Sequence, residues 1–139
     1  MSKLINPETI KNIDLREAIQ LEIDRFIRLQ FIDASLEVLG KPQKLEKKVS
    51  IIIFRILQEF FSNTIKHSKA SELKVKLEYT ITSLLITASD NGIGLASTEI
   101  KNSGIGMQNI KSRADLIEAK TQFISEKNKG TTLIINYTL

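Results

Sequence analysis

Cysteine and tryptophan are absent from this 139-residue chain, and it contains only two prolines and one histidine. The lack of cysteine excludes disulfides and thiolate metal sites, and it is typical of a reducing compartment. The longest apolar run begins near Ile51 and is interrupted by Arg55, so it is far shorter than the ~20 residues of a membrane-spanning helix. The N-terminus also lacks the charged, apolar and small-residue sections of a signal peptide. We therefore expect a cytoplasmic domain that makes no membrane contact.

Hydrophobic residues make up 42% of the chain, and its formal net charge is +4. That apolar content is sufficient for one core, and the length is near the commonest domain size. Lysines gather at residues 41–48 and 127–129 without interleaved aromatic residues. Such runs are more typical of solvated loops than of a nucleic-acid surface. We expect a single domain without a nucleic-acid partner.

The spacing of apolar residues divides the chain into helices and strands. Residues 1–13 show little pattern and are expected to be a tail or the stub of a linker, ahead of one domain at 14–139. Helical spacing predicts helices over 14–29, 45–67 and 107–119, and alternation predicts strands over 32–38, 73–79, 84–89, 123–125 and 131–138. Consecutive strands joined by short turns favour antiparallel pairs. The expected class is therefore α+β, a two-layer sandwich with a mixed, mostly antiparallel sheet and helices on one face.

Glycine is scarce, at six residues, yet four of the six form two Gly-x-Gly pairs. Gly92 and Gly94 follow Asp90, whereas Gly104 and Gly106 precede a helical segment. Such pairs indicate backbone that needs positive φ or lies close to a ligand, and a glycine turn before a helix suits phosphate. The second pair taken alone also fits a flexible lid, because the third glycine of a dinucleotide fingerprint and the Gly-Lys-Ser/Thr of a P-loop are both missing. Asp90 could accept the exocyclic amine of a base or simply cap an Asx-turn.

Glu59, Asn63 and His67 lie on one stripe of the second predicted helix, at i, i+4 and i+8. Asn63 falls within the apolar arc of that helix, where a buried amide without a partner costs ~1–3 kcal/mol. One interpretation is a hydrated pocket in which Asn63 binds a Mg²⁺–phosphate ligand and Glu59 holds a water or accepts a proton. The alternative is that both side chains satisfy neighbouring backbone groups.

Two further features carry weaker signals on their own. His67 follows Lys66 at the end of the helix and is typical of a C-terminal cap. Thr131 and Thr132 follow Gly130 and indicate the start of a β-branched strand.

Taken together, the order and spacing of these elements resemble the GHKL ATPases, the superfamily that includes gyrase and the histidine kinases. Four motifs carry the resemblance: an N box (Glu59 to His67), a G1 box (Asp90 to Gly94), a G2 box (Gly104 to Met107) and a trailing Gly-Thr (Gly130 to Thr132). The run from Gly106 to Arg113 is most similar to the sensor histidine kinases of the nitrate-sensor and DesK-like group. Ala119 stands where many relatives have a glycine, which leaves the local turn open.

The resemblance implies a Bergerat fold that binds ATP with Mg²⁺. It implies that Glu59 is the catalytic base or positions water, that Asn63 binds Mg²⁺, and that Asp90 receives the adenine amine. The other implied nucleotide-binding residues are Lys66 and His67 at the edge of the site, Gly92, Gly94, Gly104 and Gly106 around the lid and phosphates, Met107, and Thr132 in support of Asp90 or the base. Residues 95–103 would form a short lid.

The implied function is the catalytic domain of a two-component sensor histidine kinase, which transfers the γ-phosphoryl group of ATP to a histidine on a separate helical domain and so serves a response regulator. The only histidine, His67, belongs to the N box, so the phosphoacceptor is expected on another domain. The chain would then be separately encoded or excised from a membrane-anchored sensor, and monomeric when isolated. The alternatives are a free-standing anti-sigma-factor-like serine kinase and a nucleotide-binding interaction module without catalysis.

Overall fold

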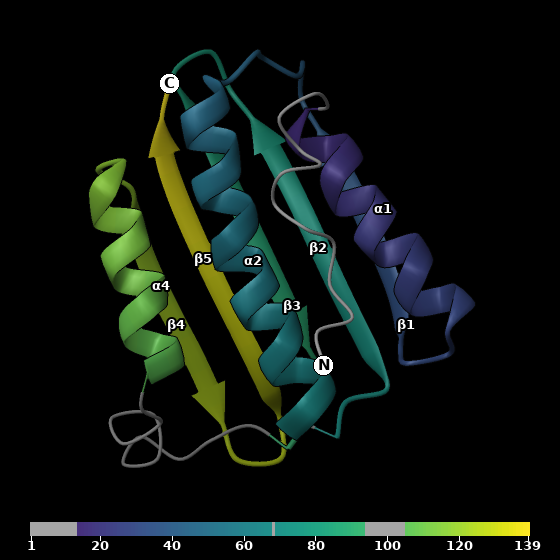
Figure 1. Ribbon diagram of the computed structural model, residues 1–139. Coiled ribbons are helices and arrows are strands. Elements are labelled where there is room, and N and C mark those ends of the chain that lie inside the picture. Colours follow the sequence, from purple (N-terminus) through teal and green to yellow (C-terminus); the bar gives the residue numbers. More distant parts are fainter. Residues whose placement is uncertain (1–13, 68, 94–104) are drawn as a thin grey trace.

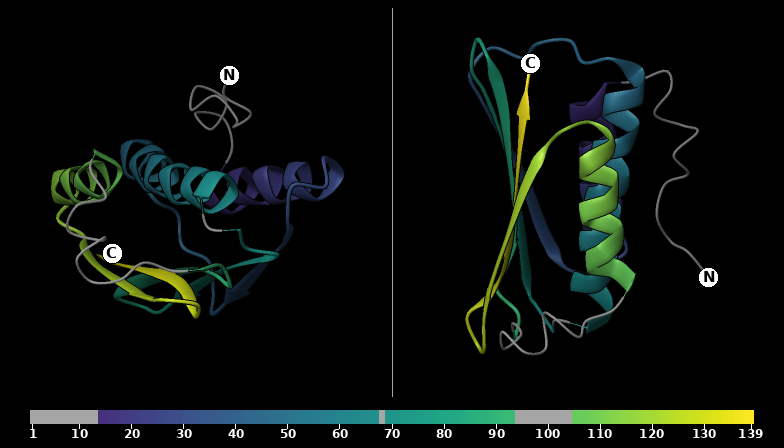
Figure 2. Two further views of the ribbon diagram at one scale, coloured as in Figure 1. Left: turned by 90° about the horizontal axis from the view of Figure 1, so that it is seen from below. Right: turned by 90° about the vertical axis from the view of Figure 1, so that its left-hand side faces the viewer.

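The computed structural model describes residues 14–67, 69–93 and 105–139, and these form a helical layer packed on one face of a five-stranded sheet (Figure 1). The elements are α1 (Leu15–Arg28), β1 (Asp33–Leu39), α2 (Lys47–His67), β2 (Glu72–Tyr79), β3 (Ser83–Asp90), α4 (Ile105–Leu116), β4 (Lys120–Glu126) and β5 (Gly130–Thr138). Figure 2 shows the helices side by side in one layer, with the sheet as the other. The predicted α+β class is confirmed. The expected tail and the expected lid lie outside the described residues.

The strands follow the order β1-β2-β3-β5-β4 across the sheet. β1 pairs with β2 in parallel, and the other three pairs are antiparallel. The parallel pair arises because α2 connects β1 to β2, and a parallel connection must cross from one end of the sheet to the other. The sheet is therefore mixed and mostly antiparallel, as the sequence predicts.

The first helix begins and ends where its sequence provides caps. Asp14 is the N-cap, and its carboxylate accepts a hydrogen bond of 2.8 Å from the backbone N–H of Glu17. Arg25 and Arg28 lie in the last turn, where positive charge is favourable to the helix dipole. Among the described residues, no helix is both long and apolar enough to cross a membrane.

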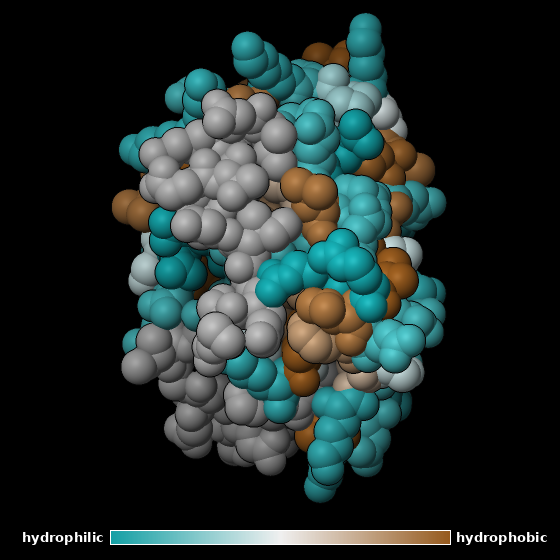
Figure 3. Space-filling view, turned by 45° about the vertical axis from the view of Figure 1, so that its right-hand side comes forward, coloured by the Kyte–Doolittle hydropathy of each residue, from teal (hydrophilic) through white to brown (hydrophobic). Residues whose placement is uncertain are grey.

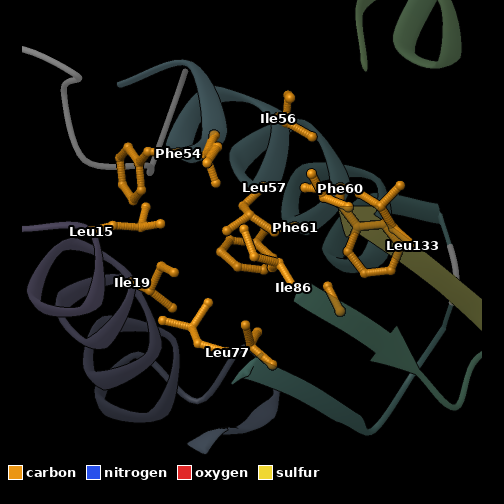
Figure 4. Close-up of a cluster of buried hydrophobic side chains, with 14 of the residues drawn as sticks. Leu15, Ile19, Phe54, Ile56, Leu57, Phe60, Phe61, Leu77, Ile86 and Leu133 are labelled. Carbon is orange, nitrogen blue, oxygen red and sulfur yellow. The ribbon is translucent and has the colours of Figure 1, made fainter. Parts of the chain in front are cut away.

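The hydrophobic core lies between α2 and the central strands (Figure 4). Phe54, Phe60 and Phe61 of α2 are almost completely buried, and removing each from water stabilises the fold by roughly 1.5–3 kcal/mol. The rings of Phe26 and Phe61 meet edge to face with their centroids 5.8 Å apart, which joins α1 to α2. Figure 3 shows the surface around α1, where apolar groups are separated by hydrophilic side chains.

Strand alternation places Asp90 beneath the helices. In β3 the buried positions are Leu84, Ile86, Ala88 and Asp90. The side chains of alternate strand residues point to the same face. The Asp90 carboxylate therefore continues the apolar row of β3 at its last position, on the face that α2 covers.

The turn between α4 and β4 differs from the predicted boundary. α4 ends at Leu116, not at 119, and β4 begins at Lys120, not at 123. Glu118 adopts a left-handed conformation with φ 55°, and the backbone N–H of Ala119 bonds to the carbonyl of Ala114 at 2.9 Å. Because the left-handed residue is Glu118, position 119 needs no glycine, and Ala119 instead packs into the core.

Candidate functional site

The candidate motifs converge at one end of the molecule. There α2 and β3 end, while β5 and α4 begin (Figure 1). The N box, the G1 box and the trailing Gly-Thr therefore meet although up to about 70 residues separate them. The topology assembles at this end the polar side chains that the sequence singles out.

Asp90 is a buried carboxylate held by two different elements. Its Oδ1 accepts a hydrogen bond of 2.9 Å from the backbone N–H of Gly92, and its Oδ2 accepts one of 2.8 Å from the hydroxyl of Thr64 on α2. The bond from Gly92 is the Asx-turn contact, which the sequence offers as the alternative role of Asp90. Since a carboxylate has about four acceptor sites, these two donors leave Asp90 able to accept the amine of a base as well.

Asn91 anchors the next step of the chain. Its side-chain oxygen accepts hydrogen bonds of 2.9 Å from the backbone N–H groups of Ser71 and Glu72. Its amide nitrogen donates to the hydroxyl of Ser71, also at 2.9 Å. The start of the G1 box is therefore tied to the start of β2. The G1 box as read from the sequence gives Asn91 no role, so this contact is not predicted.

Glu59 lies on α2 and is partly buried. The amide nitrogen of Asn109 on α4 donates to its Oε1 at 3.4 Å. This contact connects the N box to the helix of the G2 box. Among the described residues, Asn109 is the polar partner of Glu59, and Glu59 is only partly buried, which suits a group that must reach a ligand.

Asn63 corrects one expectation. The apolar pattern of α2 places it toward the core, but its side chain is exposed. It lies in the last turns of α2, at the rim of the apolar arc, whereas Phe60 and Thr64 take the buried positions there. Asn63 is therefore open to a ligand and is not a buried amide that needs an internal partner.

Thr132 corrects a second expectation. In the antiparallel register Asp90 lies opposite Thr131, and Thr132 lies opposite Ser89. Thr132 therefore points to the sheet face away from the helices and does not support Asp90. Thr131 shares the face of Asp90, where its hydroxyl lies 2.9 Å from the hydroxyl of Ser125.

The remaining candidate residues are described only in part. Lys66 is exposed, and His67 is the last residue of α2. α4 begins at Ile105, so Gly106 lies in its first turn, not in a loop before it as the sequence predicts; Met107 follows. The side chains of His67 and Met107 lie outside the described residues, as do Gly94 and Gly104 entirely.

The oxygen donors at this end of the molecule fit a magnesium ion that a bound phosphate would also help to hold. Across the described ranges, no group of three acidic, histidine or cysteine residues is arranged to bind a metal. Mg²⁺ commonly uses only one or two protein oxygens and takes the rest of its ligands from phosphates and water. The exposed amide oxygen of Asn63, at the same end of the molecule as Asp90, meets that requirement.

The family described as histidine kinase-, DNA gyrase B-, and HSP90-like ATPase matches residues 48–139. All four motifs fall within this range, and the match covers most of the chain. The chain therefore belongs to this ATPase family. ATP is the ligand that such a domain binds.

Sensor histidine kinases are similar to this chain within that family. The kinase/phosphatase DegS of Brevibacillus brevis is 36% identical over 98 residues, which cover 70% of this chain and 25% of DegS. The sensor histidine kinase LiaS of Bacillus subtilis is 33% identical over 129 residues, covering 93% of this chain and 35% of LiaS. The chain thus spans about a third of the length of these relatives, or less. The resemblance to sensor histidine kinases is confirmed.

A solved structure supports the fold independently. The histidine kinase AdeS of Acinetobacter baumannii superposes with a TM-score of 0.69 at 16% identity, over 89% of this chain and 62% of that structure. At this identity the likeness concerns the fold alone. It agrees with the two-layer architecture and with the resemblance to the Bergerat fold.

Proposed function

We propose that this chain binds Mg²⁺ and ATP together and transfers the γ-phosphoryl group to a histidine on a separate helical domain, which in turn serves a response regulator. The observation that carries the proposal is the Asp90 carboxylate, held by Thr64 and Gly92 at the same end of α2 as Glu59 and Asn63. An adenine acceptor, a proton acceptor and a metal ligand are thereby provided within one small region.

Each residue then has a distinct role. Asp90 accepts a hydrogen bond from the 6-amino group of adenine and disfavours guanine, whose 6-oxygen is an acceptor. Asn63 contributes one oxygen ligand to Mg²⁺, and the ion supplies charge neutralisation at the phosphates. Glu59, one turn earlier, accepts a proton from the attacking imidazole. The imidazole nitrogen bonds to the γ-phosphorus as the bond to the bridging oxygen breaks, and ADP leaves.

A histidine acceptor is favoured over a serine acceptor by the relatives. DegS and LiaS are both named as histidine kinases. The chain spans only part of such proteins, so we infer that the phosphoacceptor helices belong to a further domain or to another protein. Glu59 is only partly buried and lies beside Asn109 of α4, so an acceptor would reach it from this side of α2.

A transfer assay in trans tests the proposal. The 139-residue chain is incubated with Mg²⁺, labelled ATP and either a helical phosphoacceptor domain of the histidine-kinase type or an anti-sigma-antagonist-type serine substrate. We expect acid-labile label on the helical domain, abolished when its acceptor histidine is replaced by glutamine. Acid-stable label on the serine protein would favour the serine-kinase alternative. ATP binding without transfer to either substrate would favour a non-catalytic module.

A further inference from the structure

Thr64 follows Asn63 in the N box but points in another direction. Its side chain is 2% exposed, and its hydroxyl donates to Oδ2 of Asp90 at 2.8 Å. We propose that Thr64 is a positioning residue that sets the adenine selectivity of the site, because it fixes the carboxylate to which the base binds. This inference rests on the proposed role of Asp90 as the adenine acceptor.

Threonine is a costly choice at this position unless its hydroxyl is used. A β-branched side chain lowers helix propensity relative to alanine, and a buried hydroxyl without a hydrogen bond is destabilising. The bond to Asp90 satisfies the hydroxyl. It also offsets the lower helix propensity, since a hydrogen bond to a carboxylate is about twice as strong as one between neutral groups. The hydroxyl therefore has a specific partner 26 residues away in sequence.

The two hydrogen bonds to Asp90 together determine the orientation of its carboxylate. Gly92 holds Oδ1 from the chain that follows β3, whereas Thr64 holds Oδ2 from α2. With only the Gly92 bond, the carboxylate plane could still rotate about that contact. With both bonds, the remaining acceptor sites have fixed directions, and a preorganised acceptor discriminates strongly between a ligand with an amine and one without it.

The same bond connects two parts of the proposed site. Thr64 lies on α2 with Glu59 and Asn63, and its hydroxyl joins that helix to the end of β3. A base bound at Asp90 is thereby held at a set distance from the helix that carries the proposed metal ligand. Thr64 thus aligns the base with the phosphate end of the site without touching the phosphates.

Isothermal calorimetry without metal tests this inference with two probes, ADP and purine riboside 5′-diphosphate, which lacks the 6-amino group. The wild-type chain is expected to bind ADP more tightly. Thr64→Val removes the hydroxyl and keeps the shape of the side chain. Because Asp90 would then no longer be held in place for the adenine amine, we expect about tenfold weaker ADP binding, the loss of roughly one hydrogen bond to a charged group. Binding of the deaminated probe should change less than about twofold. Thr64→Ser keeps the hydroxyl and should keep the preference.

Thr131→Val is the matched control. Thr131 is also buried, at 8% exposure, and it lies on the same sheet face as Asp90. Its hydroxyl, however, lies within hydrogen-bond distance of the Ser125 hydroxyl. Its removal should leave the preference for ADP unchanged. If Thr64→Val does not fold by circular dichroism, Thr64→Ala replaces it, because alanine is the best helix former.

The possible outcomes distinguish the proposed role of Asp90 from that of Thr64. A wild-type chain that binds both probes equally would overturn the adenine role of Asp90 and this inference with it. A wild-type preference that survives intact in Thr64→Val would overturn the role of Thr64 alone. Equal losses for both probes in Thr64→Val would show that Thr64 is only structural, and would also overturn it.

Discussion

At the scale of single residues, the polar groups of the site differ in how far the fold determines their positions. Asp90 is buried and held by two hydrogen bonds from different elements. Glu59 is partly buried, and its contact with Asn109 is longer, at 3.4 Å. Asn63 is exposed. Replacing Asp90 would therefore disturb packing as well as binding, whereas replacing Asn63 should report on the ligand alone.

Asn63→Ala is expected to weaken binding of Mg²⁺ with ATP by about tenfold or more, the loss of one metal ligand or strong polar contact. Metal-free ADP should bind within about twofold of wild type. Because Asn63 is exposed, the free energy of unfolding should change by no more than about 0.5 kcal/mol. Calorimetry with both ligands and a urea unfolding curve provide the measurements. Equal affinity losses for the two ligands would show that Asn63 does not act through the metal.

Glu59→Gln is expected to abolish most phosphoryl transfer while ATP still binds. The amide keeps an oxygen that can accept from Asn109, but it has no charge and no basicity. General-base catalysis contributes about 10²–10⁴-fold, so transfer per bound ATP should fall within that range. Transfer to a helical phosphoacceptor domain supplied in trans and ATP affinity are measured on the same samples. A variant with full transfer activity would remove the catalytic role and leave the binding site intact.

At the scale of secondary-structure elements, local periodicity predicts most of the architecture. The strict alternation of β2 and β3 places their buried faces correctly and, with them, Asp90. Alternation cannot reveal which residue of β5 lies opposite Asp90, because that depends on the pairing register. The resemblance implies that Thr132 supports Asp90 or the base, but the register places Thr131 opposite Asp90.

The helices show a similar limit. Helical spacing gives the direction of each side chain around α2 but not how far its neighbours extend along the axis. The apolar arc of α2 includes Asn63, yet Asn63 is exposed near the end of the helix. Thr64 lies four residues after Phe60 on the buried face. In the sequence, the signal for this contact is a polar side chain at the helical spacing of the apolar positions, four residues after Phe60.

Gly130 begins β5 in a left-handed conformation, with φ +89°. A Cβ atom there would lie 2.0 Å from the backbone oxygen of Asp90. We therefore expect Gly130→Ala to destabilise the fold by about 1–3 kcal/mol or more, from the strained φ alone, and to displace Asp90. Urea unfolding and the affinity ratio of ADP to its deaminated analogue measure the two effects.

Gly40→Ala is the matched control for Gly130→Ala. Gly40 has φ +80°, and a Cβ atom there would lie 2.1 Å from the backbone oxygen of Tyr79. Tyr79 and Asp90 lie at opposite ends of the paired strands β2 and β3. Both variants should lose stability, but only Gly130→Ala should lose the preference for ADP. A Gly40→Ala variant with the same loss of preference would show that general destabilisation is the cause.

At the scale of the whole molecule, the two ends of the sheet have different tasks. The candidate site occupies the end where β3 finishes, and the N-cap of α1 and the turn after β1 occupy the other. One continuous core joins them beneath α1 and α2. Changes at the end far from the site should therefore alter global stability without altering nucleotide selectivity, and Tyr79 offers a way to make such a change with pH.

Burial and the nearby negative charge of Asp14 raise the pKa of Tyr79 above its ordinary value of 10.0, and Arg16 opposes them in part. Above the ordinary pKa, the unfolded chain loses the Tyr79 proton while the folded chain keeps it. The unfolded state then binds fewer protons, so the free energy of unfolding must fall with rising pH until the folded pKa is passed. Tyr79→Phe cannot ionise, so its stability should fall less steeply between about pH 10 and 11, starting from the ordinary tyrosine pKa. Urea unfolding at intervals from pH 8 upward compares the two slopes, and parallel curves for the two proteins would contradict the raised pKa. Selectivity for ADP at neutral pH should be the same in both, since Tyr79 lies at the end of the sheet opposite to Asp90.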